Sequence, residues 1–247
     1  MKVLITGAGG FLGRGLVVPF EERGDKLRLM DVVSFTSKHE VVTGDVSDLD
    51  AVMKAAEGME AIVIAHMAPR TNNAYDFPAM PFDINVKGTA NLFHAAVKKG
   101  IKKVVLISST AVMEYSKGSV HPHDFPRKSR GFYGLTKVCQ EIIAESFAAE
   151  FGIKVACLRV GYIMDGEKNV DKYGKKVEER APLDTDRRDI GGVARAFLDR
   201  DDLSFELFTV MSTPESMVEW DVQYTCKRLN WKPKYDFSWL RIPGQKK

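Results

Sequence analysis

Cysteine, long apolar runs and an apolar leader are all scarce or absent in this chain of 247 residues. The three cysteines at 139, 157 and 226 are too few and too widely spaced for a disulfide framework or a zinc site, and they favour a reducing compartment. No apolar run approaches the length of about eighteen residues that a membrane span needs. A strand pattern begins at residue 2, which leaves no room for a signal peptide. We therefore expect a cytoplasmic protein with neither a membrane anchor nor a metal site.

An excess of charge of one sign is missing as well. The formal net charge is +3, from 36 basic and 33 acidic residues, and no nucleic-acid-binding motif occurs. Basic clusters at 127–130 and 172–176 are interpreted as solvated surface, with contact to an anionic substrate as the alternative. Hydrophobic residues make up 45% of the chain, as in globular proteins, and its length suffices for one large domain or a core with a small lobe.

Short apolar runs alternate with longer amphipathic segments. The runs predict strands at 3–6, 27–31, 40–43, 61–65, 104–108 and 154–159, and their Val, Ile and Leu content is typical of parallel strands buried on both faces. The segments predict helices at 11–23, 48–57, 85–99 and 132–151, with Asp48 as an N-cap and a kink at Pro19. Glycines at 24, 58, 100 and 152 should end these helices. This rhythm predicts an α/β fold with a doubly wound parallel sheet, the Rossmann fold, which binds ligands at the carboxyl ends of its strands.

A glycine-rich turn follows the first predicted strand. Gly7, Gly10 and Gly13 have the spacing of a dinucleotide-phosphate turn, because glycine allows a tight bend, close approach of a pyrophosphate and close packing of the next helix. The amides at that helix N-terminus would face the phosphates. Asp31 ends the second strand, where a carboxylate binds ribose hydroxyls and repels a 2′-phosphate. NAD is therefore favoured over NADP, and an ordinary Gly-rich βα turn is the alternative.

The alternation weakens after residue 160. Residues 165–169 and 184–186 are interpreted as loops, 190–198 and 214–230 as helices, and 206–210 as a strand. We expect residues 1–160 to form the NAD-binding core. Residues 161–247 would form a small substrate-binding lobe over the carboxyl edge of the sheet, integrated with the core in a single structural domain.

Three residues are candidates for proton transfer. Tyr133 and Lys137 stand four apart on a predicted helix and share a face. An ammonium stabilises a nearby phenolate, which can take a proton from an alcohol that is being oxidised; an ordinary surface pair is the alternative. Ser109 follows the strand at 104–108, where its hydroxyl could bind the reacting oxygen or only satisfy a strand-end amide.

These stretches together resemble the extended short-chain dehydrogenases/reductases, the NAD-dependent epimerase/dehydratase type. The likeness rests on residues 6–13, 44–48, 66–68, 85–89, 107–112 and 133–137, which follow one another in the family's order over about the first 160 residues. It implies a catalytic set of Ser109, Tyr133 and Lys137, with the serine aligned through Val112. Lys137 would also bind the nicotinamide ribose.

The resemblance also implies which residues hold NAD. Asp45 and Val46 would contact the adenine, and Ala65, His66 and Ala68 would line the nicotinamide ribose. Asn85 would support the site, with a helix N-cap as the alternative, and His66 receives no proton-transfer role. The complete expected set is Gly7, Gly10, Phe11, Leu12, Gly13, Asp31, Asp45, Val46, Ala65, His66, Ala68, Asn85, Tyr133 and Lys137.

Departures from the family pattern bear on the substrate. Met113 and Glu114 replace the usual Tyr-Gly, and no asparagine follows Arg159, as it does in many nucleotide-sugar enzymes. The chain is also shorter than those enzymes, so a small carbohydrate or sugar acid fits better than a sugar nucleotide. Residues 152–161 are similar to uronate dehydrogenases. Candidates for holding a substrate carboxylate are Lys168, Lys172, Arg127 and Arg130, with a solvated surface as the alternative.

The expected function is NAD-dependent oxidation of a hydroxyl group of a small carbohydrate or sugar acid. Two alternatives stay open: an epimerase or dehydratase that uses NAD transiently, and a non-catalytic NAD-binding redox sensor. The resemblance further implies a homodimer formed through the helices at 85–99 and 132–151. Their apolar residues suit an interface and the sheet surface equally well: Leu92, Phe93, Val97, Ile142, Ile143 and Phe147.

Overall fold

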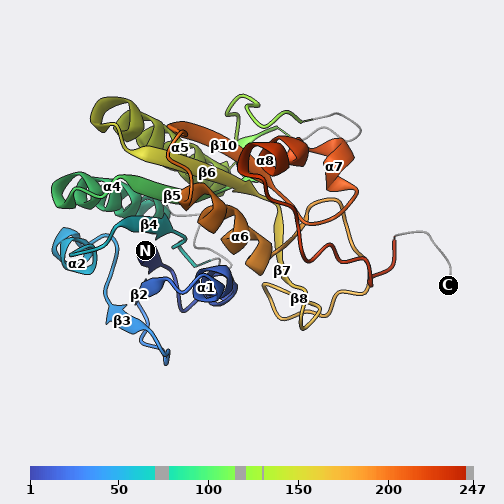
Figure 1. Ribbon diagram of the computed structural model, residues 1–247, viewed down its shortest axis with the longest axis horizontal. Helices are drawn as coiled ribbons and strands as arrows, with labels where there is room; N and C mark the ends of the chain where they lie inside the picture. Colours follow the sequence, from blue (N-terminus) through green and yellow to red (C-terminus); the bar gives the residue numbers. More distant parts are fainter. Residues whose placement is uncertain (70–77, 115–120, 130, 243–247) are drawn as a thin grey trace.

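A seven-stranded parallel sheet forms the centre of the computed structural model, which describes residues 1–69, 78–114, 121–129 and 131–242. The strand order is β3-β2-β1-β4-β5-β6-β10 (Figure 1). The strands are β1 Lys2–Thr6, β2 Lys26–Asp31, β3 Glu40–Thr43, β4 Ala61–Ile64, β5 Lys103–Ser109, β6 Lys154–Val160 and β10 Phe205–Val210. The predicted doubly wound fold is confirmed, and the order reverses between β1 and β4, where such folds bind ligands.

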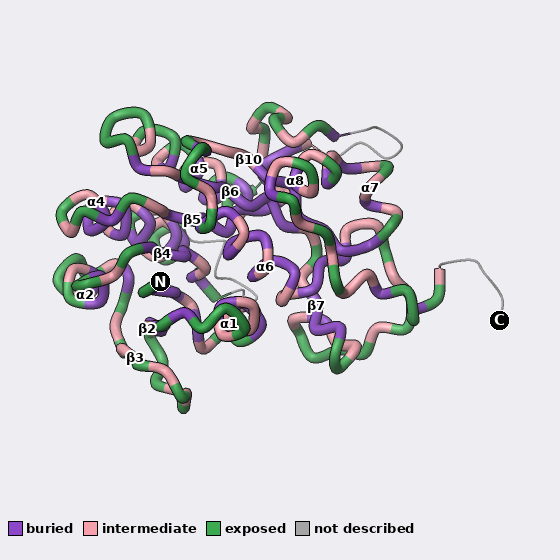
Figure 2. The backbone as a smooth tube through the Cα atoms, in the orientation of Figure 1, coloured by how far each residue is buried: buried purple, intermediate pink, exposed green. Residues whose placement is uncertain are grey.

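Helices cover both faces of this sheet. On one face α1 (Phe11–Glu22) and α6 (Arg187–Leu198) pack together, with α8 (Val222–Leu229) beside them. The other face carries α2 (Leu49–Ala55), α4 (Gly88–Lys99) and α5 (Gly131–Phe151). Alternate residues of β5 supply the two cores: Val105 and Ile107 pack in one, Val104 and Leu106 in the other. Figure 2 shows the buried strands between helices whose outer surfaces are exposed.

The backbones of α1 and α6 approach closely because glycines face the contact. A Cβ atom on Gly191 would lie 2.6 Å from the carbonyl oxygen of Leu16, and one on Gly15 would lie 2.1 Å from Cγ of Arg187. The α1 helix continues through Pro19, and Asp48 caps α2 as predicted by accepting hydrogen bonds from two amides of its first turn. Because Arg187 is the first residue of α6, this close contact places the Arg187 side chain against α1.

Two predicted helices differ from the structure. The segment at 85–99 is composite: α3 (Ala79–Pro81) leads into a π-helical turn, η1 (Phe82–Lys87), before α4 begins. The prediction of one helix at 214–230 is wrong, since α7 (Ser216–Glu219) and α8 are separate. Trp220 between them is extended and buried and stacks on His121 at 4.3 Å, while Asp221 caps α8.

A second sheet of three strands lies beyond the end of β6. It has the order β8-β7-β9, formed by β7 (Tyr162–Asp165), β8 (Val170–Asp171) and β9 (Asp184–Asp186). The prediction of loops at 184–186 and at residue 165 is therefore wrong. Residues 184–186 are buried although they are polar, because neighbouring groups satisfy them; the hydroxyl of Thr185, for example, donates to the carbonyl of Val210. Within the described residues, no helix combines the length and apolar character that crossing a membrane requires.

Candidate functional site

A cavity of about 440 Å³ opens where β1, β2, β3 and β4 end. Its wall contains most of the residues expected to hold a dinucleotide: Gly7, Gly10, Phe11, Leu12, Asp31, Asp45, Val46, Ala65 and His66. The other expected residues lie outside this wall: Gly13, Ala68, Asn85, Ser109, Tyr133 and Lys137. The cavity wall therefore contains only part of the expected site.

The glycine-rich turn has the shape of a phosphate cradle. Gly7 has φ of +67°, and a Cβ atom there would lie 2.7 Å from Cα of His66. A Cβ atom on Gly13 would lie 2.5 Å from Cα of Ala8, so larger residues would push α1 away from the turn. Gly10 is the N-cap of α1 and offers no side chain to the first-turn amides. Those amides, which lack intrahelical acceptors, can therefore bind an anion.

Asp31 is held at the end of β2 in the cavity wall. Its Oδ2 accepts a hydrogen bond from the amide of Gly9 at 2.9 Å, and its Oδ1 accepts one from the amide of Val33 at 3.2 Å. A carboxylate so fixed beside the glycine-rich turn suits the ribose hydroxyls of a dinucleotide. The cradle and this carboxylate together fit NAD.

His66 is neutral at physiological pH. Burial, assisted by the ammonium of Lys137, lowers the pKa of His66 to about 3. Its Nδ1 lies 2.9 Å from Oγ1 of Thr6, which in turn accepts a hydrogen bond from the amide of Ala65. The imidazole thus stiffens the cavity wall at the end of β4.

Asn85 is not a helix N-cap. It is fully buried in η1, where its Oδ1 accepts from the amide of Ala68 at 2.8 Å and its Nδ2 donates to Oγ1 of Thr136 at 3.0 Å. One side chain therefore links the segment after β4 to α5. Asn85 and Ala68 support the site from behind the cavity wall.

Lys137 and Ser109 lie at the carboxyl end of β5. Lys137 is buried, and its Nζ donates to the carbonyl of Ile107 at 2.8 Å. Oγ of Ser109 accepts from the amide of Ala111 at 3.1 Å and caps the short 3-10 helix η2 (Thr110–Val112). Tyr133 precedes Lys137 by one turn of α5 and is partly exposed. The structure thus brings α5 against the strand end that carries Ser109.

Comparison with known proteins identifies the family. Residues 3–177 match the model of the NAD dependent epimerase/dehydratase family. The chain belongs to this family. Members are NAD-dependent enzymes, either dehydrogenases or epimerases, so the fit of the cavity to NAD agrees with the family's cofactor.

Several relatives act on small sugars according to their names. Uronate dehydrogenase of Pseudomonas putida is 29% identical over 167 residues, which cover 65% of this chain and 60% of that enzyme. L-arabinose 1-dehydrogenase (NAD(P)+) of Haloferax volcanii is 26% identical over 198 residues, or 70% of this chain and 74% of that enzyme. The solved uronate dehydrogenase of Agrobacterium tumefaciens shares the fold, with a TM-score of 0.77 and 23% identity over 95% of this chain and 85% of that one.

Within this family member, buried polar contacts fix the helix that carries Tyr133. Glu141 of α5 accepts hydrogen bonds from Ser108, Arg127 and Arg159. Gln140 donates to Oγ1 of Thr89 on α4. Sequence reasoning missed Glu141 and Arg159; the available signal was a glutamate one turn after Lys137 on the same helical face.

The candidates for a substrate carboxylate have different surroundings. Arg127 pairs with Glu141 and Glu145, so its guanidinium is already engaged within the protein. Lys168 is exposed, and Arg130 lies outside the described residues. Lys172 lines the cavity together with Ile163 and Tyr173, three residues absent from the expected cofactor set.

Proposed function

We propose that this family member is an NAD-dependent dehydrogenase that oxidises a hydroxyl group of a small carbohydrate or sugar acid. The burial of Lys137 carries the proposal. An ordinary surface pair would leave the lysine in solvent, whereas Lys137 is 4% exposed and reaches the carbonyl of Ile107 beside the strand end of Ser109. Burying an ammonium costs free energy, which favours a functional role for the Tyr133–Lys137 pair.

Each polar residue has a distinct role in the proposed reaction. NAD, when bound, supplies the oxidant. The ammonium of Lys137 stabilises Tyr133 as a phenolate, and the phenolate oxygen takes the proton of the substrate hydroxyl. The hydroxyl of Ser109 donates to the substrate oxygen and fixes its position. Asn85 and Glu141 act through α5 by holding these groups in place.

Relatives and residues both support a small substrate. Uronate dehydrogenase and L-arabinose 1-dehydrogenase are among the relatives by name, and both names denote single sugars. Arg159 is followed by Val160 and Gly161, so this chain lacks the asparagine of many nucleotide-sugar enzymes. We propose aldoses and uronic acids as the first substrates to test.

Replacement of Tyr133 by Phe tests the chemistry. We expect NADH formation to fall about 10²–10⁴-fold, which is the usual contribution of general base catalysis, while the NAD dissociation constant stays nearly unchanged. Steady-state absorbance of NADH gives the rate, and calorimetric titration gives the binding constant. Turnover at the wild-type rate in this variant would refute the assignment of Tyr133.

Net NADH formation separates the proposed dehydrogenase from an epimerase or dehydratase. A dehydrogenase releases one NADH for each product, whereas transient use of NAD converts the sugar without accumulating NADH. Product analysis beside absorbance therefore decides between them. Tight NAD binding without conversion of any tested sugar would favour a non-catalytic sensor instead.

We also propose a homodimer formed through α5. Leu92 and Phe93 of the neighbouring α4 are fully buried against the sheet, so they belong to the core of one chain. Ile142 of α5 is 51% exposed and is therefore available to a second copy. An apolar side chain on the outer face of a long helix supports this interface.

A further inference from the structure

The C-terminal half of the chain contributes a structured turn to the cavity. The carboxylate of Asp171 accepts hydrogen bonds from the amides of Tyr173 and Lys175, each at 2.9 Å. The same carboxylate accepts one from the hydroxyl of Tyr162, also at 2.9 Å. These contacts fix the turn that carries Lys172. The side chain of Lys172 is part of the cavity wall.

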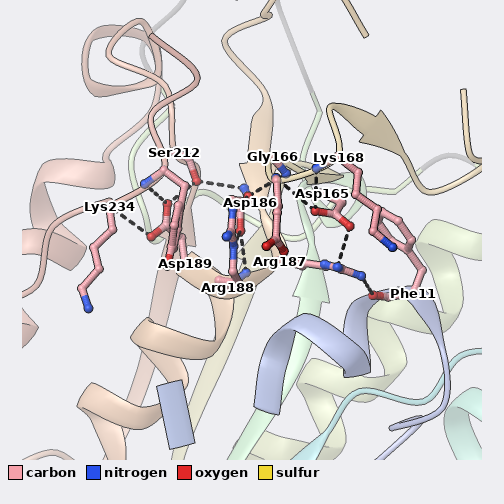
Figure 3. A network of polar contacts seen from close by, with 12 residues as sticks. Phe11, Asp165, Gly166, Lys168, Asp186, Arg187, Arg188, Asp189, Ser212 and Lys234 are labelled. Atoms are coloured by element: carbon pink, nitrogen blue, oxygen red, sulfur yellow. Dashed lines mark hydrogen bonds and ion pairs between the residues drawn. The ribbon is translucent and has the colours of Figure 1, made fainter. Parts of the chain in front are cut away.

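A polar network joins the end of β7 to the start of α1 (Figure 3). Arg187 donates to the carbonyl of Phe11 at 3.1 Å and pairs with Asp165 at 2.5 Å. Asp165 ends β7, the strand that pairs with β8, and β8 leads into the turn at Lys172. The turn is thereby tied to the helix whose N-terminal amides form the phosphate cradle.

The side chain of Lys172 is oriented by two aromatic rings. Its Nζ lies 5.1 Å from the ring centroid of Tyr162 and 5.4 Å from that of Tyr173, within the range of cation–π attraction. These contacts reduce the conformational freedom of a long side chain, so less entropy is lost when the ammonium binds an anion.

The charges of the lining residues indicate which ligand group Lys172 binds. Among the described lining residues, Asp31 and Asp45 are carboxylates, His66 is neutral, and Lys172 is the one permanent cation. A dinucleotide brings two negative charges on its pyrophosphate. The amides of α1 supply partial positive charge on one side, and Lys172 supplies a full charge in the same cavity.

We propose that Lys172 binds the pyrophosphate of NAD across the cavity from the N-terminus of α1. This inference rests on the proposed use of NAD and adds to it a cofactor-binding residue from outside the glycine-rich core. It assigns the β7–β8 segment to cofactor binding, whereas a carboxylate-binding role would assign it to the substrate. Lys172 lines the same cavity as Gly10, Phe11 and Leu12 of the glycine-rich turn, which favours the pyrophosphate as its ligand.

Direct binding measurements on Lys172→Ala test the inference. The ligands are NADH, followed by fluorescence, and ADP-ribose and adenosine, followed by calorimetry. We expect binding of NADH and ADP-ribose to weaken about tenfold, as for loss of a hydrogen bond to a charged group, and binding of adenosine to stay unchanged. Lys172→Arg should restore most of the affinity, and added salt should narrow the difference between Lys172→Ala and wild type.

Lys175→Ala is the matched control, because Lys175 is exposed in the same turn, lies outside the cavity wall and carries the same charge. It should bind all three ligands as wild type does, and equal melting temperatures would establish that both variants are folded. Unchanged NADH affinity in Lys172→Ala would overturn this inference but leave the proposed function standing, even if the KM of a sugar acid rises. An equal loss for adenosine would also overturn it. Failure of the wild type to bind NADH would instead refute the proposed function.

Discussion

The buried contact between Glu141 and Arg159 should control the stability of the helix that carries Tyr133. Both side chains are fully buried, and they form two hydrogen bonds at 2.9 and 3.0 Å. Burial raises the pKa of Glu141, but hydrogen bonds from Arg159, Ser108 and Arg127 outweigh it and hold the pKa below the usual value. The glutamate is therefore ionised, and its charge is fully balanced inside the protein.

Glu141→Gln should lower the free energy of unfolding by about 3–5 kcal/mol, because Arg159 stays buried without its counter-charge. Urea unfolding followed by circular dichroism measures this change. The midpoint should fall while the slope against urea stays constant, since the surface exposed on unfolding is unchanged. Turnover should also fall, because α5 positions Tyr133 and Lys137.

Glu145→Gln provides the control. Glu145 also pairs with Arg127, but its side chain is 51% exposed, so its loss should change stability by about 1 kcal/mol or less. Glu141→Leu combined with Arg159→Met should lose less stability than Glu141→Leu alone, because the double variant leaves no unpaired charge. A loss in Glu141→Gln no larger than that in Glu145→Gln would refute the reasoning.

Three further predictions concern packing, pH and assembly. Gly191→Ala should destabilise the protein by about 1–3 kcal/mol in thermal or urea unfolding, although alanine favours helices, because its Cβ would lie 2.6 Å from the carbonyl of Leu16; a stabilised variant would contradict this. Burial raises the pKa of Asp189 to about 6, above the ordinary value, so this residue's contribution to stability is lost as pH rises from about 4 to 6. Relative to wild type, Asp189→Asn should therefore gain about 3 kcal/mol between pH 4 and 7, and an unchanged difference between the two proteins would count against the shift. Ile142→Glu should convert a dimer to a monomer in light scattering while leaving the melting temperature nearly unchanged, and a wild type that is already monomeric would exclude the α5 interface.

The main sheet could be predicted because its residues carry a local pattern. In β5 every residue from Val104 to Ile107 is apolar, and parallel strands between two helical layers need apolar side chains on both faces. The glycine-rich turn could also be predicted because Gly7, Gly10 and Gly13 lie in one short stretch, although the contact that requires glycine at position 7 is with His66 at the end of β4. Both features depend on short stretches of chain, which a single sequence displays directly.

Contacts between distant segments could not be predicted in the same way. Lys172 is visible in the sequence as part of a basic cluster, but it lines the cavity together with residues that are distant in the sequence, such as Phe11 and Asp31. Those residues come from three separate parts of the chain. Hydrophobic periodicity does not predict contacts between distant segments. From the sequence alone, the cluster at 172–176 is therefore interpreted as solvated surface, with a site for a substrate carboxylate as the alternative.

The strand β9 shows why hydrophobic periodicity fails at this site. Asp184, Thr185 and Asp186 are polar, and a pattern that equates polarity with exposure assigns them to a loop. All three are buried because hydrogen-bond partners compensate for their loss of water: the amide of Asp186, for example, donates to Oγ of Ser212 at 2.9 Å. The same aspartate caps α6 and thereby sets where Arg187 begins its path toward α1. Hydrophobic periodicity therefore fails to predict a strand such as β9, which polar partners stabilise, even though β9 helps to position Lys172, the residue that we assign to cofactor binding.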